Sequence, residues 1–324
     1  QTDQAAYLFN EFWEQESTNS RLLMAAVDTF ISQKRYEDAV IVFSEMRKAA
    51  PDNDNLNFFL GMAYESSKNP EQAIQHYLKV SPAHPQYKKT LLTIGFLYRE
   101  TGKEEKAVAF LEDHHKNNPE DIDIISYLAA FYEQQGRLEK AMDLLAKGLS
   151  DAPENTSLLF RLGALQDKAG QKDACIATMK KIIALDPDDA SALNYLGYTY
   201  ADLGIHLDKA QTLIKKALKI KPDDAYITDS LGWVYFKQKE YEKAVFYLKK
   251  AADMTGYETI IASHLADAYV ETGQLSKALT VYHKAVVNAK KDDTDLVQEL
   301  KTKIKKLEQQ GITPDTPETR QSQE

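Results

Sequence analysis

The chain has 324 residues, of which 43% are hydrophobic and 27% charged, and its formal net charge is −9. An acidic balance disfavours nucleic-acid binding, which usually requires a basic surface, and no run of 18 apolar residues predicts a membrane-spanning helix. The single cysteine, Cys175, excludes an internal disulfide, and we expect it to be a small buried core residue.

The predicted elements follow a period of about 34 residues. Six of the ten prolines recur with steps of 34, 34, 34, 34 and 35 residues, at Pro51, Pro85, Pro119, Pro153, Pro187 and Pro222. A proline at this interval marks a copied supersecondary unit, and 34 residues is the length of a helix–turn–helix repeat. We therefore predict an all-α chain of stacked helix pairs, each with a first and a second helix.

The first predicted element, residues 1–16, is a single helix. Its Ala5, Phe9 and Phe12 fall at positions 20, 24 and 27 of the repeat, which is the pattern of a second helix without its first. We interpret it as the end of a truncated upstream repeat, because the chain does not begin with methionine. Exposed Phe9, Phe12 and Trp13 would form an apolar patch, which favours a homo-oligomer through this helix.

Residues 20–292 contain eight repeats with the same pattern of residue types. When the proline is numbered position 32, position 8 is small, position 11 is aromatic and position 20 is alanine in seven of the eight repeats. Small residues at positions 8 and 20 let the two helices approach closely. A glycine at position 15, such as Gly102 or Gly136, provides the left-handed residue that ends the first helix. The proline ends the second helix.

At these positions the chain resembles the tetratricopeptide repeat family, most clearly in NYLGYTYADLG and DSLGWVYFKQKEYEKA between Ala190 and Ala244. The resemblance implies a right-handed superhelical solenoid of about eight units. The predicted units are 20–53, 54–87, 88–121, 122–155, 156–189, 190–224, 225–258 and 259–292. The sixth has one additional residue near Ile205–Leu207. This segment is most similar to bacterial repeat proteins, many of them exported or lipid-anchored, which favours a cell-envelope location, with the cytoplasm as the alternative.

The repeats are followed by one predicted amphipathic helix at 293–310. Its apolar stripe consists of Leu296, Val297, Leu300, Ile304 and Leu307. The end of a solenoid requires a polar outer face, so we interpret this helix as a cap, with a partner-binding helix as the alternative. Residues 311–324 contain Pro314 and Pro317 among polar residues, and we expect them to form a disordered tail.

The sequence contains no catalytic, cofactor-binding or metal-binding constellation. The segment TGKEEKA at 101–107 lacks the upstream glycine and the following serine or threonine of a phosphate-binding loop. His114 and His115 are adjacent, so on a helix they point in different directions and do not share a metal ion easily. We expect a protein that is not an enzyme and has no cofactor.

The resemblance places function on the concave surface of the solenoid, which first helices line through positions 2, 5, 6, 9, 12 and 13. The Lys, Asn, Lys and Arg clamp with which chaperone-binding members hold a terminal carboxylate is absent, and large apolar and aromatic side chains recur instead. The candidate partner-binding residues are Phe58, Phe59, Met62, Phe96, Arg99, Tyr127, Phe160, Arg161, Asn194, Tyr195, Tyr198, Tyr226, Asp229, Trp233 and Phe236. The alternative for each residue is packing between neighbouring first helices.

Three functional hypotheses follow from this pattern. The first is a non-enzymatic scaffold or adaptor that binds a peptide segment or helix of a partner protein in the groove, through apolar anchors. The second is a structural assembly subunit that associates with itself through residues 1–16. The third is the binding arm of a larger enzyme whose catalytic domain lies upstream.

Overall fold

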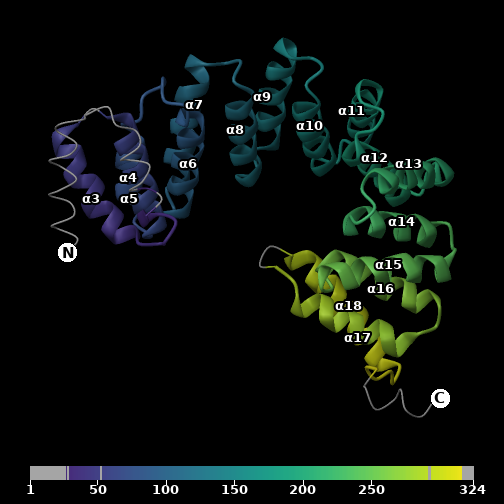
Figure 1. The fold of residues 1–324 in the computed structure, drawn as a ribbon. Helices are drawn as coiled ribbons and strands as arrows, with labels where there is room; N and C mark the ends of the chain where they lie inside the picture. Colours follow the sequence, from purple (N-terminus) through teal and green to yellow (C-terminus); the bar gives the residue numbers. More distant parts are fainter. Residues whose placement is uncertain (1–26, 28, 52, 291–292, 316–324) are drawn as a thin grey trace. The chain divides into compact units, whose positions relative to one another are not determined.

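The computed structural model of the chain describes residues 27, 29–51, 53–290 and 293–315. Within these residues the structure consists of sixteen α-helices and no strand (Figure 1). The predicted all-α repeat fold is confirmed. The helix predicted for residues 1–16 lies outside the described residues.

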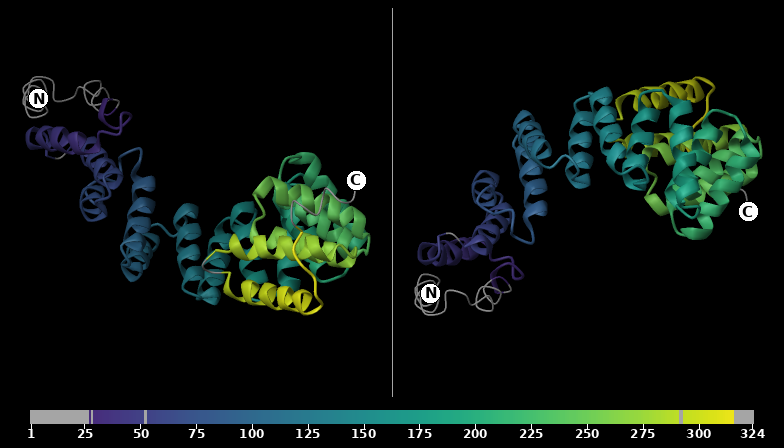
Figure 2. Two further views of the ribbon diagram at one scale, coloured as in Figure 1. Left: turned by 90° about the horizontal axis from the view of Figure 1, so that it is seen from below. Right: turned by 90° about the horizontal axis from the view of Figure 1, so that it is seen from above.

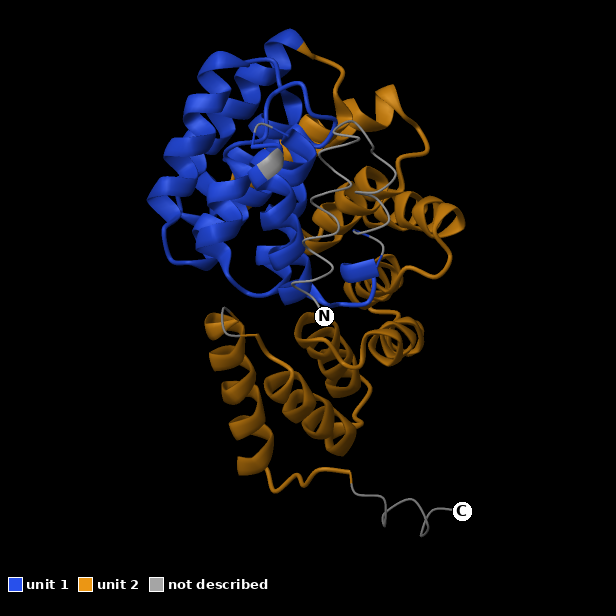
Figure 3. Ribbon diagram, turned by 60° about the vertical axis from the view of Figure 1, so that its left-hand side comes forward, with its two compact units in different colours: residues 1–151 blue, residues 152–324 orange. Residues whose placement is uncertain are grey.

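The chain divides into two compact units, which we call the N-terminal unit (residues 1–151) and the C-terminal unit (residues 152–324; Figure 3). The helices described in the N-terminal unit are α3 (Tyr36–Ala49), α4 (Asp54–Ser66), α5 (Pro70–Tyr77), α6 (Tyr87–Glu100), α7 (Glu104–Asn117), α8 (Ile122–Gln134) and α9 (Leu138–Asp151). Those described in the C-terminal unit are α10 (Thr156–Lys168), α11 (Lys172–Leu185), α12 (Ala190–Asp202), α13 (Leu207–Ile220), α14 (Ala225–Lys237), α15 (Tyr241–Thr255), α16 (Thr259–Glu271), α17 (Leu275–Val287) and α18 (Thr294–Gln309).

First and second helices alternate within each unit. The first helices are α4, α6 and α8 in the N-terminal unit and α10, α12, α14 and α16 in the C-terminal unit. Each first helix packs against the second helix that follows it. In the C-terminal unit, α12 also packs against α14 and α14 against α16, so the first helices form a layer of their own.

Most first helices begin after a side chain that caps their free backbone N–H groups. Asn53 Oδ1 accepts a hydrogen bond from the Leu56 amide at 3.1 Å, and Asp189 Oδ1 accepts one from the Ala192 amide at 2.8 Å. The other capping residues are Asp121, Asn155, Asp224 and Glu258. In five repeats this residue follows the periodic proline by two positions, so the proline ends one helix and the cap starts the next.

First helices end at a residue in the left-handed conformation, as the glycine pattern predicts. The five glycines at position 15 have φ between 68° and 76°. In repeats that lack the glycine, a lysine adopts the same conformation, with φ of 58° at Lys34, 59° at Lys68 and 63° at Lys239. After Lys68 the Asn69 amide still bonds to the Tyr64 carbonyl at 2.8 Å. The closing hydrogen bond therefore forms with either residue, although the lysine is strained by about 1 kcal/mol.

Close helix approach within a repeat depends on the small residue at position 8. A Cβ atom built on Gly61 of α4 would lie 2.4 Å from the Tyr77 ring of α5. In the C-terminal unit, a Cβ on Gly232 of α14 would lie 2.6 Å from Leu248 of α15. At these two glycines, the large side chain at position 24 lies directly against position 8. A methyl group added there would overlap the space that this side chain already occupies.

The cores of the two units consist of buried apolar side chains between the packed helices. In the N-terminal unit, one cluster joins Phe43 and Met46 of α3 to Leu56 and Leu60 of α4. Cys175 on α11 is fully buried, as expected, and burial raises the pKa of its thiol to about 11. The sulfur is therefore a core atom rather than an accessible nucleophile.

Helix α18 packs on α17 through Leu300, Ile304 and Leu307, and in both views of Figure 2 it lies beside other helices of the C-terminal unit. The chain then turns back. The Asp315 amide bonds to Thr280 Oγ1 of α17 at 2.8 Å. Of the tail expected at residues 311–324, the structure describes residues 311–315, and residues 316–324 lie outside the described residues.

The close approach at position 8 can be tested by adding one methyl group. We expect Gly61→Ala to lower the free energy of unfolding of the N-terminal unit by about 1–3 kcal/mol, because the Tyr77 ring, which is buried and hydrogen-bonded to Glu65, would have to shift. Urea unfolding followed by circular dichroism measures the difference.

Gly95→Ala on α6 is the matched control. Its added Cβ would meet Leu111 at 3.4 Å, an ordinary contact, and alanine favours a helix by about 1 kcal/mol over glycine. This variant should be as stable as the wild type or more so. Equal destabilisation by both substitutions would contradict the proposed role of close approach.

Candidate functional site

The first helices of the C-terminal unit present a row of aromatic side chains, which we call the first-helix face (α10, α12, α14 and α16). At its beginning, the rings of Phe160 on α10 and Tyr195 on α12 meet edge to face, with centroids 5.6 Å apart. The Tyr195 hydroxyl also donates to Asp167 of α10 at 3.1 Å. These contacts fix the orientation of Tyr195, so it is a rigid part of the surface.

The centre of the first-helix face is a stack of rings. Trp233 on α14 is parallel to Phe236, with centroids 4.7 Å apart, and to His264 on α16, with centroids 4.1 Å apart. Lys237 lies over the Trp233 ring at 4.9 Å. The stack joins α14 to α16, and Trp233 is only 9% exposed.

A buried ion pair lies beneath this stack. Nδ1 of His264 is 3.0 and 3.1 Å from the two carboxylate oxygens of Asp229 on α14, and both residues are buried. Burial by itself lowers the pKa of His264, but the Asp229 carboxylate outweighs it and the net pKa is raised. The pair therefore favours a protonated imidazole between α14 and α16.

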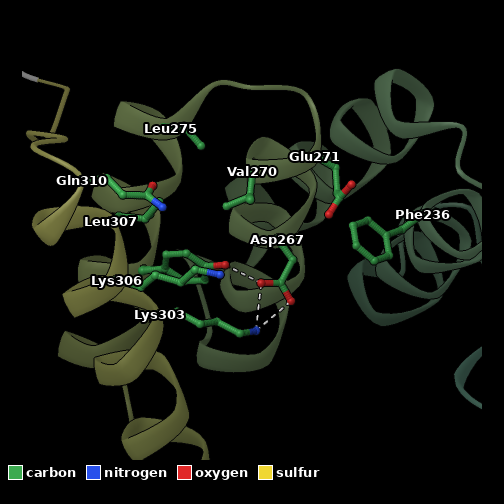
Figure 4. Close-up of a pocket in the computed structure, with 10 residues that line it drawn as sticks. Phe236, Asp267, Val270, Glu271, Leu275, Lys303, Lys306, Leu307 and Gln310 are labelled. Atoms are coloured by element: carbon green, nitrogen blue, oxygen red, sulfur yellow. Dashed lines mark hydrogen bonds and ion pairs between the residues drawn. The ribbon is translucent and has the colours of Figure 1, made fainter.

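A cavity of about 410 Å³, which we call the cap cavity, opens between α14, α16, α17 and α18 (Figure 4). Its apolar lining comes from Phe236 of α14, Val270 of α16, Leu275 of α17 and Leu307 of α18. Phe236 also stacks on Trp233, so this one residue belongs both to the cavity lining and to the aromatic row.

One wall of the cap cavity is a polar network that ties α18 to the repeat before it. Nζ of Lys303 on α18 lies 2.9 and 3.0 Å from the carboxylate oxygens of Asp267 on α16, and the Tyr282 hydroxyl of α17 donates to the same carboxylate. Burial opposes the charge on Lys303, but its hydrogen bonds to Asp267 and Glu299 raise its pKa above the ordinary value. The lysine therefore stays charged and holds α18 in place.

The candidate partner-binding residues differ in how much surface they offer. Tyr226, Tyr127 and Phe96 are exposed, at 61%, 46% and 42%. Phe58, Asp229 and Trp233 are buried. The half-buried candidates are Phe59, Met62, Arg99, Phe160, Arg161, Asn194, Tyr195, Tyr198 and Phe236.

The candidates of the N-terminal unit separate into two groups. Phe58 belongs to the apolar cluster between α4, α5 and α6, against which Phe59 and Met62 also pack. On α6, the Arg99 guanidinium lies over the Phe96 ring at 5.0 Å and also donates to Gln134 of α8 at 3.2 Å. Phe96 and, on α8, Tyr127 are the exposed candidates of this unit.

Two features of the site are missing from the residues selected by sequence. His264 at position 6 is the partner of Asp229, and Lys303, Leu307 and Gln310 make the cap helix α18 a wall of the cavity. The position pattern identifies which face of a helix is inward. It contains no signal for a side-chain pair formed across two repeats.

Comparison with known proteins agrees with this repeat architecture. The family model for the tetratricopeptide repeat matches residues 31–92, 134–196 and 235–304, together more than half of the chain. The chain belongs to the tetratricopeptide repeat family. A search of curated proteins finds no match.

Solved tetratricopeptide repeat structures have the same fold. A tetratricopeptide repeat protein from Parabacteroides merdae is 15% identical, with 76% of this chain and 98% of that chain covered and a TM-score of 0.61. The APC/C hetero-tetramer Cut9–Hcn1 contains a chain that is 17% identical, with 90% of this chain and 58% of that chain covered and a TM-score of 0.56. At these identities the likeness shows the fold alone.

Metal-binding clusters and membrane-spanning helices are both absent from the described residues of this tetratricopeptide repeat chain. In the described residues, no group of three or more histidine, cysteine, aspartate or glutamate side chains is arranged so that it could hold a metal ion. Nor does the described part contain a helix with the length and apolar character required to span a membrane.

The ion pair predicts a pH-dependent stability. We expect Asp229→Asn to lower the free energy of unfolding of the C-terminal unit by about 3 kcal/mol near pH 6, because it leaves one buried partner unpaired. The raised pKa of His264 gives a contribution that is complete below the ordinary histidine pKa of about 6.5 and is lost as the pH rises through the raised value. The difference between wild type and variant should therefore shrink with increasing pH.

Urea unfolding at a series of pH values measures this difference. Asp223→Asn, which changes an exposed carboxylate just before α14, should leave stability unchanged at every pH. A pH-independent effect of Asp229→Asn would argue against a charged His264.

Proposed function

We propose that this chain is a non-enzymatic adaptor that binds a segment of a partner protein along the first-helix face of its C-terminal unit, with an apolar side chain of the partner in the cap cavity. Tetratricopeptide repeats typically act as protein–protein interaction scaffolds, and the solved Cut9–Hcn1 hetero-tetramer is an assembly of proteins. The fold supports the class of function, and the surface described above supports the location.

The aromatic row supports protein binding because it combines exposed contact area with rigidity. Tyr226 at the start of α14 is 61% exposed and Ile260 at the start of α16 is 48% exposed. Farther along the helices, Tyr195 and Phe236 are half-buried and held by neighbouring rings. Aromatic residues that are already ordered lose little entropy on binding, which is why they dominate binding energy at interfaces.

Two buried polar atoms on the same face lack a hydrogen-bond partner among the described residues: the Trp233 indole Nε1 and the Asn194 side-chain oxygen. A buried donor or acceptor without a partner costs about 1–3 kcal/mol. Both atoms are shielded from the surface in this conformation, so they mark buried positions of the face and not groups that a ligand contacts directly.

The single observation that carries the proposal is the position of Phe236. Its ring stacks on Trp233 and also lines the cap cavity. The cavity has the size of pockets that enclose ligand groups, roughly 300–1,000 Å³, and its apolar walls suit an aliphatic or aromatic side chain. A peptide that follows the aromatic row therefore reaches a pocket for an anchor residue.

Peptide selection on the purified chain tests this proposal. Peptides selected from a random displayed library should bind less tightly by about tenfold or more when Phe236 or Tyr226 is changed to alanine, because each loses a large contact surface. Fluorescence anisotropy with a labelled selected peptide measures the dissociation constant, and circular dichroism confirms that the variants remain folded.

Phe246→Ala is the matched control for this experiment. Phe246 lies on the second helix α15 and is 66% exposed, so the substitution removes an equally accessible aromatic ring outside the first-helix face. Peptide affinity should not change. If Phe246→Ala weakens binding as much as Phe236→Ala, the selected peptides recognise exposed rings in general and the proposed surface is wrong.

The alternative of self-association was based on residues 1–16, which lie outside the described residues. No contact in the described part favours it over peptide binding. The adaptor therefore remains the function that the described surface supports best.

A further inference from the structure

The N-terminal unit contains a crevice of about 420 Å³ that is separate from the first-helix face. It lies between the second helices α7 and α9, with α8 at its base. The base is apolar and buried: Leu128 is 1% exposed, Tyr132 2% and Leu144 7%. Residues on α9 line it at positions 140, 143, 144 and 147, the spacing of one helix face. The crevice is thus built from three ordered helices.

On one side of the crevice, the charges of the lining side chains neutralise one another. Nζ of Lys140 lies 2.6 Å from Oε1 of Glu112 and 4.3 Å above the ring of Tyr132, whose hydroxyl donates to the same carboxylate. The hydrogen bond from Lys140 is the main reason why the pKa of Glu112 is lowered. This wall is a satisfied network, and it leaves no charge for a ligand.

The other side has an excess of positive charge. It is formed by His115 and Lys116 of α7 and by Lys147 of α9, and Asp143 is the one carboxylate in the lining besides Glu112. Once Glu112 and Lys140 are paired, two lysines face one carboxylate. In addition, Nδ1 of His115 is buried and has no hydrogen-bond partner among the described residues. The combination is a wall of two exposed lysines beside the half-buried His115 ring, above an apolar base.

We propose that this crevice is a second docking site, for an acidic segment of a partner protein. A carboxylate of that segment contacts His115, Lys116 and Lys147, and an adjacent apolar side chain packs on Leu128 and Leu144. The charges decide the ligand class, because an excess of one positive charge matches a single carboxylate, and the buried leucines favour a ligand with an apolar part. The site is independent of the first-helix face, so each can fail without the other.

Proton uptake gives this site a distinctive signature. Burial and the nearby Lys147 lower the pKa of His115. The charged groups of the lining are Glu112 and Lys116 on its own helix and Lys140, Asp143 and Lys147 on α9, while α8 contributes the Tyr132 hydroxyl. A bound carboxylate stabilises the protonated ring, so binding and protonation are reciprocal. Affinity should therefore increase as the pH falls, until the ring of the free protein also becomes protonated, below the ordinary histidine pKa of about 6.5.

The test uses the full chain and a fluorescein-labelled peptide of alternating leucine and glutamate, with fluorescence anisotropy as the readout. We expect Lys116→Gln and Lys147→Gln each to weaken binding about threefold, which is typical of a solvent-exposed ion pair, and the double variant about tenfold. His115→Gln should remove the increase in affinity at low pH. The corresponding peptide of leucine and glutamine should not bind.

Lys106→Gln is the matched control, because Lys106 is an exposed lysine of α7 outside the crevice and its loss changes the net charge equally. It should leave the affinity unchanged, as should Phe236→Ala in the other unit. Equal losses with Lys106→Gln, an absence of saturable binding, or displacement of the peptide by inorganic phosphate but not by acetate would each overturn the proposal.

Discussion

The structure depends on how closely the two helices of each repeat approach. In repeats such as the second and the seventh, the absent side chain at position 8 makes room for the large side chain at position 24, as Gly61 does for Tyr77 and Gly232 for Leu248. This contact sets the distance between paired helices, and interiors packed at this density do not adjust without cost. The positions of the caps, the turns and the layer of first helices all follow from a pair geometry that is repeated along each unit.

In the C-terminal unit, the first helices α14 and α16 make some of their contacts through charged side chains and not through apolar ones. The charge pair of Asp229 and His264 joins one repeat to the next, and that of Asp267 and Lys303 joins the last repeat to the cap helix α18. Such pairs add less stability than apolar side chains of the same volume, but they are strongly directional. They hold Trp233 and α18 in defined positions, which is the property that a preorganised binding surface requires.

The sequence is sufficient to predict the repeated features, because each one is set by residues within a single repeat. The prolines, the small residues at position 8 and the left-handed glycines such as Gly102 all have the predicted roles. Contacts between repeats are not encoded in that local pattern. Trp233 occupies an inward position, as expected, yet it is buried because the neighbouring His264 lies against its ring. The cap cavity likewise requires Lys303 and Leu307; the sequence pattern assigns Leu307 to the apolar stripe of the cap helix and gives no signal that these residues line a cavity.

The lysines that replace glycine at the ends of first helices have a consequence for local opening. Lys68 and Lys239 hold a backbone conformation that their side chains disfavour, and Gly102 and Gly170 do not. The strain is released when the turn opens, so the free energy of local opening is smaller there. Backbone amides in the turns after Lys68 and Lys239 should therefore exchange with solvent deuterium sooner than those after Gly102 and Gly170.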